Sequence, residues 1–394
     1  MPIRVAVVVS QPIQHFCPFY RYIAASGQVT LKVYFASSAG LQPFFDRDFG
    51  QSIQWQADLV EGFDHEFLTD GHSAANSKEL SSIQRLPMAL AAFNPDAVVV
   101  YGYAQPISRA AIRWTKRWQK KLIYISDSEL RTRRAWWKIA LKRAVLPKIF
   151  SKVDAFLTVG DSNESYYAHY GVGRDRLFRS PFPVDLNRLH AALQDKEKLR
   201  REIRIRYSLP DDALVALTVG KLTPRKRTVD AVKAVCSLWK SETPRKTFLL
   251  AAGDGALKEM CENVAKAVCS DAIRFAGFVP VTDLPAYYVS ADMLLHPSSE
   301  DPHPLAISEA VTCGLPCIVS DRVGSVGPSD DVRPGVNGWE HAVGDYSSLA
   351  SRIRLLASSP ELLRAMSGES LRIGQQRDMK QSFRGFMAAV HFGR

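Results

Sequence analysis

The stretch LHPSSEDPHPLAISEAVTCGLPCIV, residues 295–319, decides the predicted fold. A short apolar run ends at His296 and another begins at Cys317, so we expect a strand at each end of the stretch. Pro304 suits the first turn of a helix and Gly314 suits its end, which predicts a helix between the two strands. A strand, a helix and a second strand in this order indicate a parallel sheet, and such sheets bind ligands beyond the carboxyl ends of their strands.

Strand and helix signals alternate along the rest of the chain and divide it into two halves of similar size. In the first half, apolar runs predict strands at 5–9, 31–35, 97–101, 122–125 and 155–159. The pattern then restarts and predicts strands at 215–219, 247–252, 273–275, 293–296 and 317–320. The halves join near 180–188, where Pro181 and Pro183 interrupt the pattern, and the tail 360–394 is helical in character. The expected fold class is α/β, because strands that alternate with helices build parallel sheets.

The composition is that of an ordinary globular protein. The 394 residues are 46% hydrophobic and 23% charged, which excludes a disordered or fibrous chain and favours two domains. No stretch reaches the ~18 consecutive apolar residues that a membrane-spanning helix needs. The run Val5–Val9 is too short for a signal peptide, so we interpret it as a buried first strand of a cytoplasmic protein. None of the six cysteines forms a Cys-x-x-Cys pair, which predicts reduced core thiols and no structural zinc.

Positive charge is concentrated in one part of the chain. The formal net charge is +11, and residues 101–150 contain thirteen Lys or Arg and two acids, which is 13 − 2 = +11. This window also holds four of the seven tryptophans: Trp114, Trp118, Trp136 and Trp137. Tryptophan favours the membrane interface and cations attract anionic lipids, so segment 109–148 is a candidate contact with an anionic membrane surface. The alternative is that the tryptophans pack on the sheet while the cations are merely solvated. No nucleic-acid partner is expected, because no recognised nucleic-acid module is present.

Candidate anion-binding residues follow the first strands of the second half. Gly220 opens a loop that contains four cations, among them Lys221, Arg225 and Lys226, and a loop of this kind can hold a diphosphate by charge and hydrogen bonds. The turn Gly253–Gly255 follows the next strand. The competing interpretation of the basic loop is a solvated surface.

The helix of the opening stretch offers a second candidate site. Its N-terminus, at Leu305 and Ala306, presents free N–H groups and the positive end of the helix dipole, which suits a phosphate. Glu309 lies inside the helix and can accept two hydroxyl hydrogen bonds, as from a ribose, and Glu300 or Asp301 can do the same for a sugar. The competing interpretation is that Asp301 caps the helix and Glu309 lies on its surface.

Taken together, these segments resemble glycosyltransferase family 4, which has the GT-B fold. The motifs that carry the resemblance are VGKLTPRKRTVDAVKA (219–234), AAGDGALKEM (251–260), IRFAGFVP (273–280), SADMLLHPSSEDPHPLAISEAVTCGLPCIVSD (290–321), GVNGW (335–339), VDAFLTVGDSNESYYAHYGV (153–172) and FPVD (182–185). The resemblance implies two Rossmann-like domains that face a central cleft. An N-terminal acceptor-binding domain is expected at 1–186 and a C-terminal donor-binding domain at 187–375, with a last helix, about 376–394, that crosses back to the first domain.

The resemblance also implies site residues. Lys221 and Lys226 match the cations that grip the donor diphosphate, and Phe278 matches the loop that lines the nucleobase. Asp301 and Glu309 match the two acids of the E-x7-E motif, of which the second binds ribose and the first lies by the transferred sugar. The whole implied donor site comprises Gly220, Lys221, Arg225, Lys226, Gly253, Asp254, Phe278, Glu300, Asp301, Leu305, Ala306 and Glu309.

The sequence departs from the family pattern in three places. The first acid is Asp301 rather than Glu, although Glu300 stands beside it. The usual glycine-rich turn after the first strand is replaced by residues 10–15, and a histidine common after a middle strand has no counterpart. His15 and Asp127 are therefore the candidates for the catalytic residue of the first domain, beside Asp301, Lys226 and Lys221 of the second.

The expected function is retaining transfer of a sugar from a nucleotide diphosphate sugar to a glycan or lipid-linked glycan, as in surface polysaccharide or glycolipid assembly. The alternatives are a nucleotide-sugar epimerase of the same architecture and a catalytically degenerate nucleotide-sugar-binding subunit. No obligatory metal or cofactor is expected, and the D-x-D pattern at 46–48 is interpreted as a turn. The expected location is the cytoplasm, with peripheral attachment to the inner face of the membrane as an extension of the charge argument.

Overall fold

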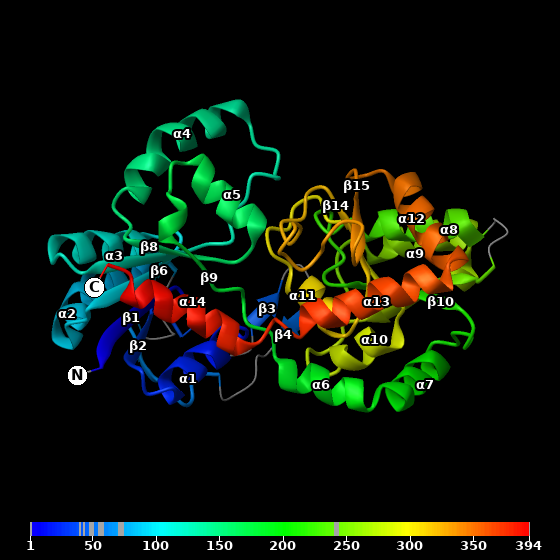
Figure 1. The fold of residues 1–394 in the computed structure, drawn as a ribbon, viewed down its shortest axis with the longest axis horizontal. Helices are drawn as coiled ribbons and strands as arrows, with labels where there is room; N and C mark the ends of the chain where they lie inside the picture. Colours follow the sequence, from blue (N-terminus) through cyan, green and yellow to red (C-terminus); the bar gives the residue numbers. More distant parts are fainter. Residues whose placement is uncertain are drawn as a thin grey trace.

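A computed structural model describes residues 2–38, 41, 44–46, 51–53, 59–69, 75–239 and 244–393. These residues form two α/β units that lie side by side, and the last helix of the chain returns to the first unit (Figure 1). Within the described ranges, no helix is both long enough and apolar enough to cross a membrane. The D-x-D pattern at 46–48 falls mostly outside the described residues, since only the backbone of Asp46 is described, in the short hairpin β3 (Phe44–Asp46) and β4 (Gln51–Ile53).

The first unit is built on a seven-stranded sheet in which all neighbouring strands are parallel. The strand order is β5-β2-β1-β6-β7-β8-β9. The strands are β1 (Ile3–Val9), β2 (Val29–Phe35), β5 (Asp64–Phe67), β6 (Ala97–Tyr101), β7 (Lys121–Ile125), β8 (Ala155–Thr158) and β9 (Leu177–Arg179). The five strands predicted from apolar runs are present, whereas β5 and β9 are short and only half-buried, so they carry no apolar run to reveal them.

Helices cover both faces of this sheet. Val5, Val7 and Val9 point to one face and pack with α1 (Cys17–Ala25) and α14 (Met379–His391). Ala6 and Val8 point to the other face, because side chains alternate along a strand. That second face packs with α2 (Ala75–Phe93), α3 (Pro106–Arg117), α4 (Trp136–Phe150) and α5 (Asp161–His169), and a single 3-10 turn, η1 (Arg174–Arg176), precedes β9. Burial on both faces explains why these strands are continuous apolar runs.

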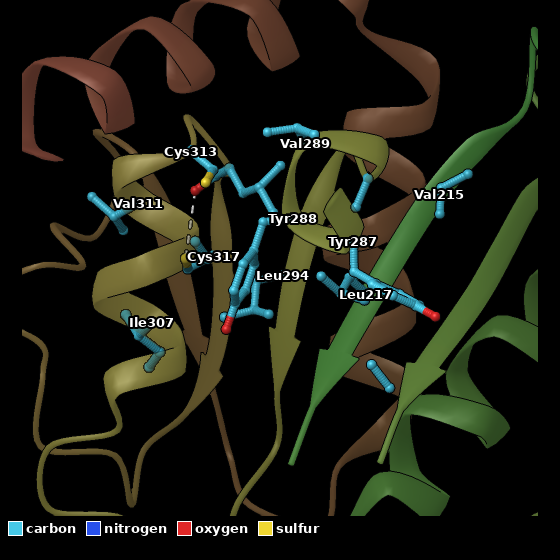
Figure 2. Packing of buried hydrophobic residues seen from close by; sticks show 14 of the residues in the cluster. Val215, Leu217, Tyr287, Tyr288, Val289, Leu294, Ile307, Val311, Cys313 and Cys317 are labelled. Atoms are coloured by element: carbon cyan, nitrogen blue, oxygen red, sulfur yellow. Dashed lines mark hydrogen bonds between the residues drawn. The ribbon is translucent and has the colours of Figure 1, made fainter. Parts of the chain in front are cut away.

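The second unit has a six-stranded parallel sheet of order β12-β11-β10-β13-β14-β15. Its strands are β10 (Leu214–Val219), β11 (Thr247–Ala252), β12 (Ile273–Gly277), β13 (Met293–His296), β14 (Cys317–Ser320) and β15 (Gly338–His341). One face packs against α6 (Leu186–Gln194), α7 (Lys196–Arg206), α10 (Leu284–Ser290) and α11 (Leu305–Thr312). Figure 2 shows Leu217 of β10 in the same core as Tyr288 and Ile307. The other face packs against α8 (Thr228–Trp239), α9 (Lys258–Val268) and α12 (Tyr346–Ser358).

The last two helices connect the units. α13 (Pro360–Gly374) packs against α11 and α12 of the second unit, and α14 packs on β8 and β9 of the first. The Ser180 hydroxyl donates to the Ser382 carbonyl at 2.9 Å, and the Ser382 hydroxyl donates to the Pro181 carbonyl at 2.7 Å. The Lys121 ammonium donates to the Val390 carbonyl at 2.7 Å. The predicted crossing back of the C-terminal helix is confirmed, and we propose domain boundaries after residues 186 and 375, close to the two places where the chain passes between the sheets.

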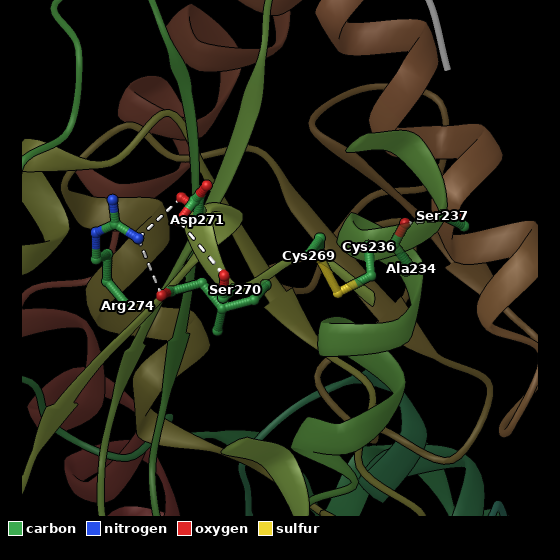
Figure 3. The surroundings of a disulfide bond; sticks show 8 residues. Ala234, Cys236, Ser237, Cys269, Ser270, Asp271 and Arg274 are labelled. Atoms are coloured by element: carbon green, nitrogen blue, oxygen red, sulfur yellow. Dashed lines mark hydrogen bonds between the residues drawn. A yellow bond between two sulfur atoms is a disulfide. The ribbon is translucent and has the colours of Figure 1, made fainter. Parts of the chain in front are cut away.

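A disulfide corrects one prediction. Cys236 of α8 and Cys269, at the end of α9, are bonded with a Cα–Cα distance of 5.4 Å (Figure 3). The prediction of reduced thiols is wrong for this pair, because residues 33 positions apart carry no spacing signal and meet only through the packing of α8 on α9. Cys17, Cys261, Cys313 and Cys317 are buried free thiols, as predicted.

The two units contact each other beside the cleft through a chain of polar groups. The Arg179 guanidinium pairs with the Asp161 carboxylate at 2.6 Å in the first unit. That carboxylate accepts a hydrogen bond from the Ser329 amide at 2.8 Å, and the Asp161 amide donates to the Asp330 carboxylate at 2.8 Å. Asp330 in turn lies 3.2 Å from the Arg377 guanidinium. Each carboxylate therefore has a cation or backbone donor, which fixes how the two sheets face each other.

The close approach of α14 to the chain after β9 can be tested with a pair of glycines. A Cβ at Gly385 would lie 1.9 Å from the Arg179 carbonyl oxygen, whereas a Cβ at Gly368, in α13, would meet no heavy atom within 4 Å. Gly385→Ala should lower the free energy of unfolding by about 2 kcal/mol or more, because neither backbone can give way. Gly368→Ala should raise it by about 0.5–1 kcal/mol. Urea unfolding measures both, and an unchanged Gly385→Ala protein would show that α14 does not pack there.

Candidate active site

Two cavities meet between the carboxyl ends of the two sheets. The first, about 380 Å³, is lined by Gly220, Lys226, Leu305, Ala306 and Glu309 of the second unit and by Ile13–His15 of the first. The second, about 660 Å³, lies against the first unit and is lined by Tyr101–Ala104, Tyr124–Ser128 and Phe182, together with Asp301 and His303. His15, Lys226 and Leu305 line both cavities. Six predicted donor-site residues and both candidates of the first unit therefore line one continuous cleft.

Glycine allows the ends of β10 and β11 to touch at the floor of this cleft. A Cβ at Gly253 would lie 1.9 Å from the Gly220 carbonyl oxygen, and Gly253 has a φ of 157°. Gly220 itself has a φ of 132°, a conformation that other residues rarely adopt. The Leu222 amide donates to the Asp254 carbonyl at 2.8 Å, which joins the two turns. The sequence pattern Gly220 and Gly253–Gly255 is thus the signature of this contact between loops.

A buried charge cluster joins the basic loop to the loop before α11. One carboxylate oxygen of Asp301 accepts a hydrogen bond from the Lys226 ammonium at 2.5 Å. The same oxygen lies 2.8 Å from Nε2 of His296, which ends β13. Asp301 and His296 are buried, and Lys226 keeps less than a fifth of its side-chain surface exposed. Asp301 therefore holds Lys226, and with it the basic loop. It is the acid that the family resemblance places beside the transferred sugar.

The surroundings set the charge of this cluster. Burial favours a raised pKa for Asp301, but the His296 hydrogen bond and Lys226 outweigh it and hold the pKa well below its usual range. Burial lowers the pKa of His296, and Lys226 lowers it further. Asp301 is therefore a carboxylate beside a cationic Lys226, and a neutral His296 donates its Nε2–H to it.

The N-terminus of α11 faces the same cavity. Pro304 is the N-cap, and Leu305 and Ala306 form the first turn. The first N–H groups of a helix have no partner within the helix, and they carry the positive end of its dipole. Because Lys226 lines the same cavity, a cation and free N–H groups converge on one space, as a phosphate requires.

Glu309 lies one turn further along α11, and its carboxylate is held from two sides. The Tyr288 hydroxyl of α10 donates to Oε2 at 2.8 Å, and the Arg188 guanidinium of α6 lies 3.4 Å from Oε1. Figure 2 shows the Tyr288 ring between α11 and the sheet. Burial raises the pKa of Glu309, whereas the Tyr288 hydrogen bond and Arg188 oppose the rise. The interpretation of Glu309 as an exposed surface residue is therefore excluded, because the side chain lines the cavity with a fixed orientation.

Six predicted donor residues do not line the two cavities. The Arg225 carbonyl accepts hydrogen bonds from the Ser298 hydroxyl at 3.0 Å and the Ser299 amide at 2.7 Å, which ties the basic loop to the loop before α11. Glu300 is half-buried and lies 4.0 Å from the Arg134 guanidinium of the first unit. The six are Lys221, Arg225, Gly253, Asp254, Phe278 and Glu300.

On the wall of the first unit, His15 and Asp127 face the charge cluster. Burial lowers the pKa of His15 to about 4, with a smaller contribution from His303. The His15 ring lies 4.3 Å from the Phe16 ring and 5.8 Å from the Phe182 ring. Asp127 is exposed toward the second cavity, which it lines together with Asp301, and partial desolvation within the cleft raises its pKa. His15 is thus neutral at physiological pH and stands opposite Lys226.

Sequence reasoning missed two residues of the cleft, His303 and Phe182. Nδ1 of His303 lies 2.9 Å from the Ser325 hydroxyl, whereas its buried Nε2 has no hydrogen-bond partner among the described residues. The Phe182 ring packs edge-on against His303 at 5.3 Å. Both residues lie inside motifs that carry the family resemblance. The local sequence, however, does not show which residues of those motifs reach the cleft.

One group of potential metal ligands adjoins the cleft. His303, Asp330 and Asp331 bring one ligand atom each within 4.8 Å of one another. Arg377 already lies 3.2 Å from Asp330 and 2.6 Å from Asp331, and the Ser308 hydroxyl donates to Asp331 at 2.7 Å. The Arg377 guanidinium contacts both carboxylates, so a cation of the protein already occupies this group.

Comparisons with known proteins agree with the fold. Residues 200–370 match the family model of glycosyl transferases group 1. The 2-deoxystreptamine glucosyltransferase of Streptomyces kanamyceticus is 32% identical over 163 residues, 39% of this chain and 41% of that protein. A D-inositol 3-phosphate glycosyltransferase of Catenulispora acidiphila is 30% identical over 188 residues, 45% of this chain and 42% of that protein. The structure of Anabaena HepE with UDP superimposes with a TM-score of 0.74 at 16% identity and covers 99% of both chains.

The fold is GT-B, with two parallel sheets that face a cleft. The part of the chain that resembles the glycosyl transferases group 1 is residues 200–370, which include the basic loop and α11. The chain spans about two fifths of the length of the two curated relatives.

The partly buried imidazole of His15 makes stability depend on pH, because its pKa is low in the folded protein. In the unfolded chain His15 takes up a proton near pH 6.5, but in the folded protein only near pH 4. Between these values the unfolded state binds more protons, so the free energy of unfolding falls as the pH falls from 6.5 to 4. His15→Gln should make this fall less steep, whereas replacement of the exposed His190 by Gln should leave it unchanged. Urea unfolding across this pH range measures the slopes, and equal slopes in wild type and His15→Gln would contradict the burial of His15.

Proposed function

We propose that the protein is a retaining glycosyltransferase that moves a hexose or related sugar from a nucleotide diphosphate sugar to a glycan or a lipid-linked glycan. The observation that carries the proposal is the convergence of Lys226, the N-terminus of α11 and Asp301 on one cleft whose opposite wall belongs to the other domain. The family match of residues 200–370 includes all three, which supports transfer of a glycosyl group.

The donor diphosphate would lie between Lys226 and the first turn of α11. Cleavage of the sugar–phosphate bond develops negative charge on the leaving phosphate and positive charge on the sugar ring. A fixed ammonium group and N–H groups stabilise that phosphate most when they are already in place before the reaction. The hydrogen bond of Lys226 to Asp301 supplies this preorganisation, since it holds the long side chain at the cavity wall.

Glu309 would bind the ribose of the donor. Tyr288 and Arg188 fix its carboxylate, and a carboxylate oxygen can accept more than one hydrogen bond. HepE is described in complexes with UDP and with UDP-glucose. We therefore propose a UDP-sugar as the first donor to test.

The acceptor would occupy the second cavity, against Asp127 and His15. Asp301 is poorly suited to form a covalent bond to the sugar, because a carboxylate whose pKa is held low by Lys226 and His296 is a weak nucleophile. Transfer would then proceed on one face of the sugar, with the leaving phosphate oxygen taking the proton of the acceptor hydroxyl as the new glycosidic bond forms. No covalent sugar–protein intermediate is needed, and neither is a metal.

An anionic membrane surface is the remaining proposed partner. Segment 109–148 carries the cations and tryptophans that motivate it. The loop Ser126–Ser128, within this segment, lines the acceptor cavity, so a lipid-linked acceptor would meet the protein where this segment meets the bilayer.

The donor site can be tested by binding and turnover together. Lys226→Ala should lower kcat at least about a hundredfold, as loss of one preorganised charge partner of the leaving group does. Glu309→Gln should weaken UDP binding about tenfold, because one hydrogen-bonded charge is removed while the shape is kept. The matched control is Lys233→Ala, an exposed lysine of α8 outside the cleft. Calorimetry with UDP and release of UDP from UDP-glucose in the presence of acceptor glycans measure these effects.

The same assay separates the alternatives. Sugar transfer with an unchanged anomeric configuration, read from the anomeric proton coupling of donor and product, would support the proposal. Conversion of the donor sugar without an acceptor would show an epimerase, and UDP binding without turnover would show a binding subunit. Full activity in both Lys226→Ala and Glu309→Gln would overturn the donor site.

A further inference from the structure

The helix α4 turns an apolar face toward solvent. Nine consecutive residues, 133–141, are exposed, although a helix of a globular domain normally buries one side. The large exposed side chains include Trp136 (80% exposed), Leu141 (58%) and Trp137 (52%). α4 lies at the outer edge of the first unit, at the top of the view in Figure 1. We therefore expect another surface, outside the core of this protein, to cover the apolar face of α4.

The exposed apolar residues of α4 are aligned. Trp136, Ala140 and Ala144 follow one another at intervals of four, and so do Trp137, Leu141 and Val145. Residues four apart stack on the same side of a helix, so these form two neighbouring apolar rows. All six are exposed. The opposite side of the helix holds the two buried residues of α4, Leu146 and Phe150.

Cations flank the apolar rows, and acids do not. Residues 131–148 contain seven Lys or Arg and no Asp or Glu. Arg131 pairs with Glu340, and Arg134 lies near Glu300, so these two face the second domain. The exposed cations that remain are Arg133, Lys138, Arg143 and Lys148. A surface with tryptophan, aliphatic side chains and positive charge fits the interface of an anionic bilayer, because rings and methyl groups enter the acyl boundary while cations meet the phosphates.

The structure also shows which part of segment 109–148 presents this apolar and cationic surface. Trp114 of α3 is buried in the core of the first unit, together with Ile107 and Ala111. The Lys116 ammonium pairs with Asp154 at 3.1 Å. Trp114 of α3 therefore packs on the sheet, as the alternative interpretation of this segment expects. Trp118, which lies just beyond the end of α3, is exposed. The apolar face belongs to α4.

We infer that α4 is a membrane-contact helix, which lies in the surface of an anionic bilayer with Trp136, Trp137 and Leu141 inserted. This contact does not depend on the glycosyl transfer proposed above. The residues 126–128 that precede it line the second cavity, so the inserted helix would hold that cavity close to the lipid surface.

Vesicle co-flotation of the full chain tests the inference. Vesicles of equal parts phosphatidylglycerol and phosphatidylcholine should carry the protein, whereas pure phosphatidylcholine should carry far less. The triple change Trp136→Ser, Trp137→Ser and Leu141→Ser should lower the partition coefficient by at least about tenfold, because apolar surface no longer leaves water. A second variant replaces four exposed cations with Ser: Arg133, Lys138, Arg143 and Lys148. The partition coefficient should fall about fivefold per cation at low salt.

A matched control lies on the other domain. Ile205 of α7 is 72% exposed and is flanked by the exposed Arg201 and Arg206. Changing these three residues to Ser removes similar groups and should leave vesicle binding unchanged. Quenching of tryptophan fluorescence by brominated acyl chains should be strong in wild type and weak in the α4 triple variant.

Other outcomes would overturn the inference. Equal binding of wild type and the triple variant would show a purely electrostatic contact without insertion. A dimer of the wild type in light scattering that disappears in the triple variant would show that a second copy covers α4. Absence of vesicle binding, with UDP binding retained, would reject the membrane contact and leave the donor site standing.

Discussion

The carboxylate of Asp301 is the constraint on which the cleft depends. It accepts hydrogen bonds from Lys226 and His296 on the same oxygen, so it joins the loop after β10 to the end of β13 and to the turn before α11. A buried carboxylate lowers the stability of the fold unless it is paired with a cation or a hydrogen-bond donor. Here the pairing places the Lys226 ammonium beside the N-terminus of α11. The position of Lys226, the charge of Asp301 and the neutrality of His296 are consequences of one contact. The family pattern has a longer acid here, and the shorter Asp301 still reaches both partners.

The relative placement of the two domains has its own origin. The polar chain from Arg179 through Asp161 and Ser329 to Asp330 and Arg377 connects the edge of one sheet to the loops of the other. Each of its ion pairs is shielded from water on at least one side, so its geometry is more restrictive than that of a surface salt bridge. The cavities lie beside this contact, and the residues that line both cavities, among them His15, Lys226 and Leu305, come from both domains. The contact between the domains therefore decides which residues of the two walls face each other across the cleft.

Sequence patterns predicted the parallel sheets and the residues of α11 well, because buried strands and helix punctuation leave strong local signals, whereas the crossing of the C-terminal helix was implied by the family resemblance. They failed where contacts are made between distant segments. β5 and β9 are half-buried and lack an apolar run, and the Cys236–Cys269 disulfide joins residues that only helix packing brings together. Lys221 and Lys226 stand in one basic loop, yet only Lys226 lines the cavities, because Asp301 holds it there. His303 and Phe182 reach the cleft by tertiary packing alone.

Because α14 packs on the first sheet, the core of the first domain depends on a segment that is synthesised after the second domain. Phe383, Phe386, Met387 and Val390 belong to the same core as Val5, Val7 and Val9. The first strand is therefore synthesised long before α14, which helps to cover it. Until α14 emerges, the apolar face that it shares with α1 is only partly covered, whereas the second domain can complete its core earlier. Such exposed surface is where nascent chains aggregate or bind chaperones, so the first domain is finished after the second.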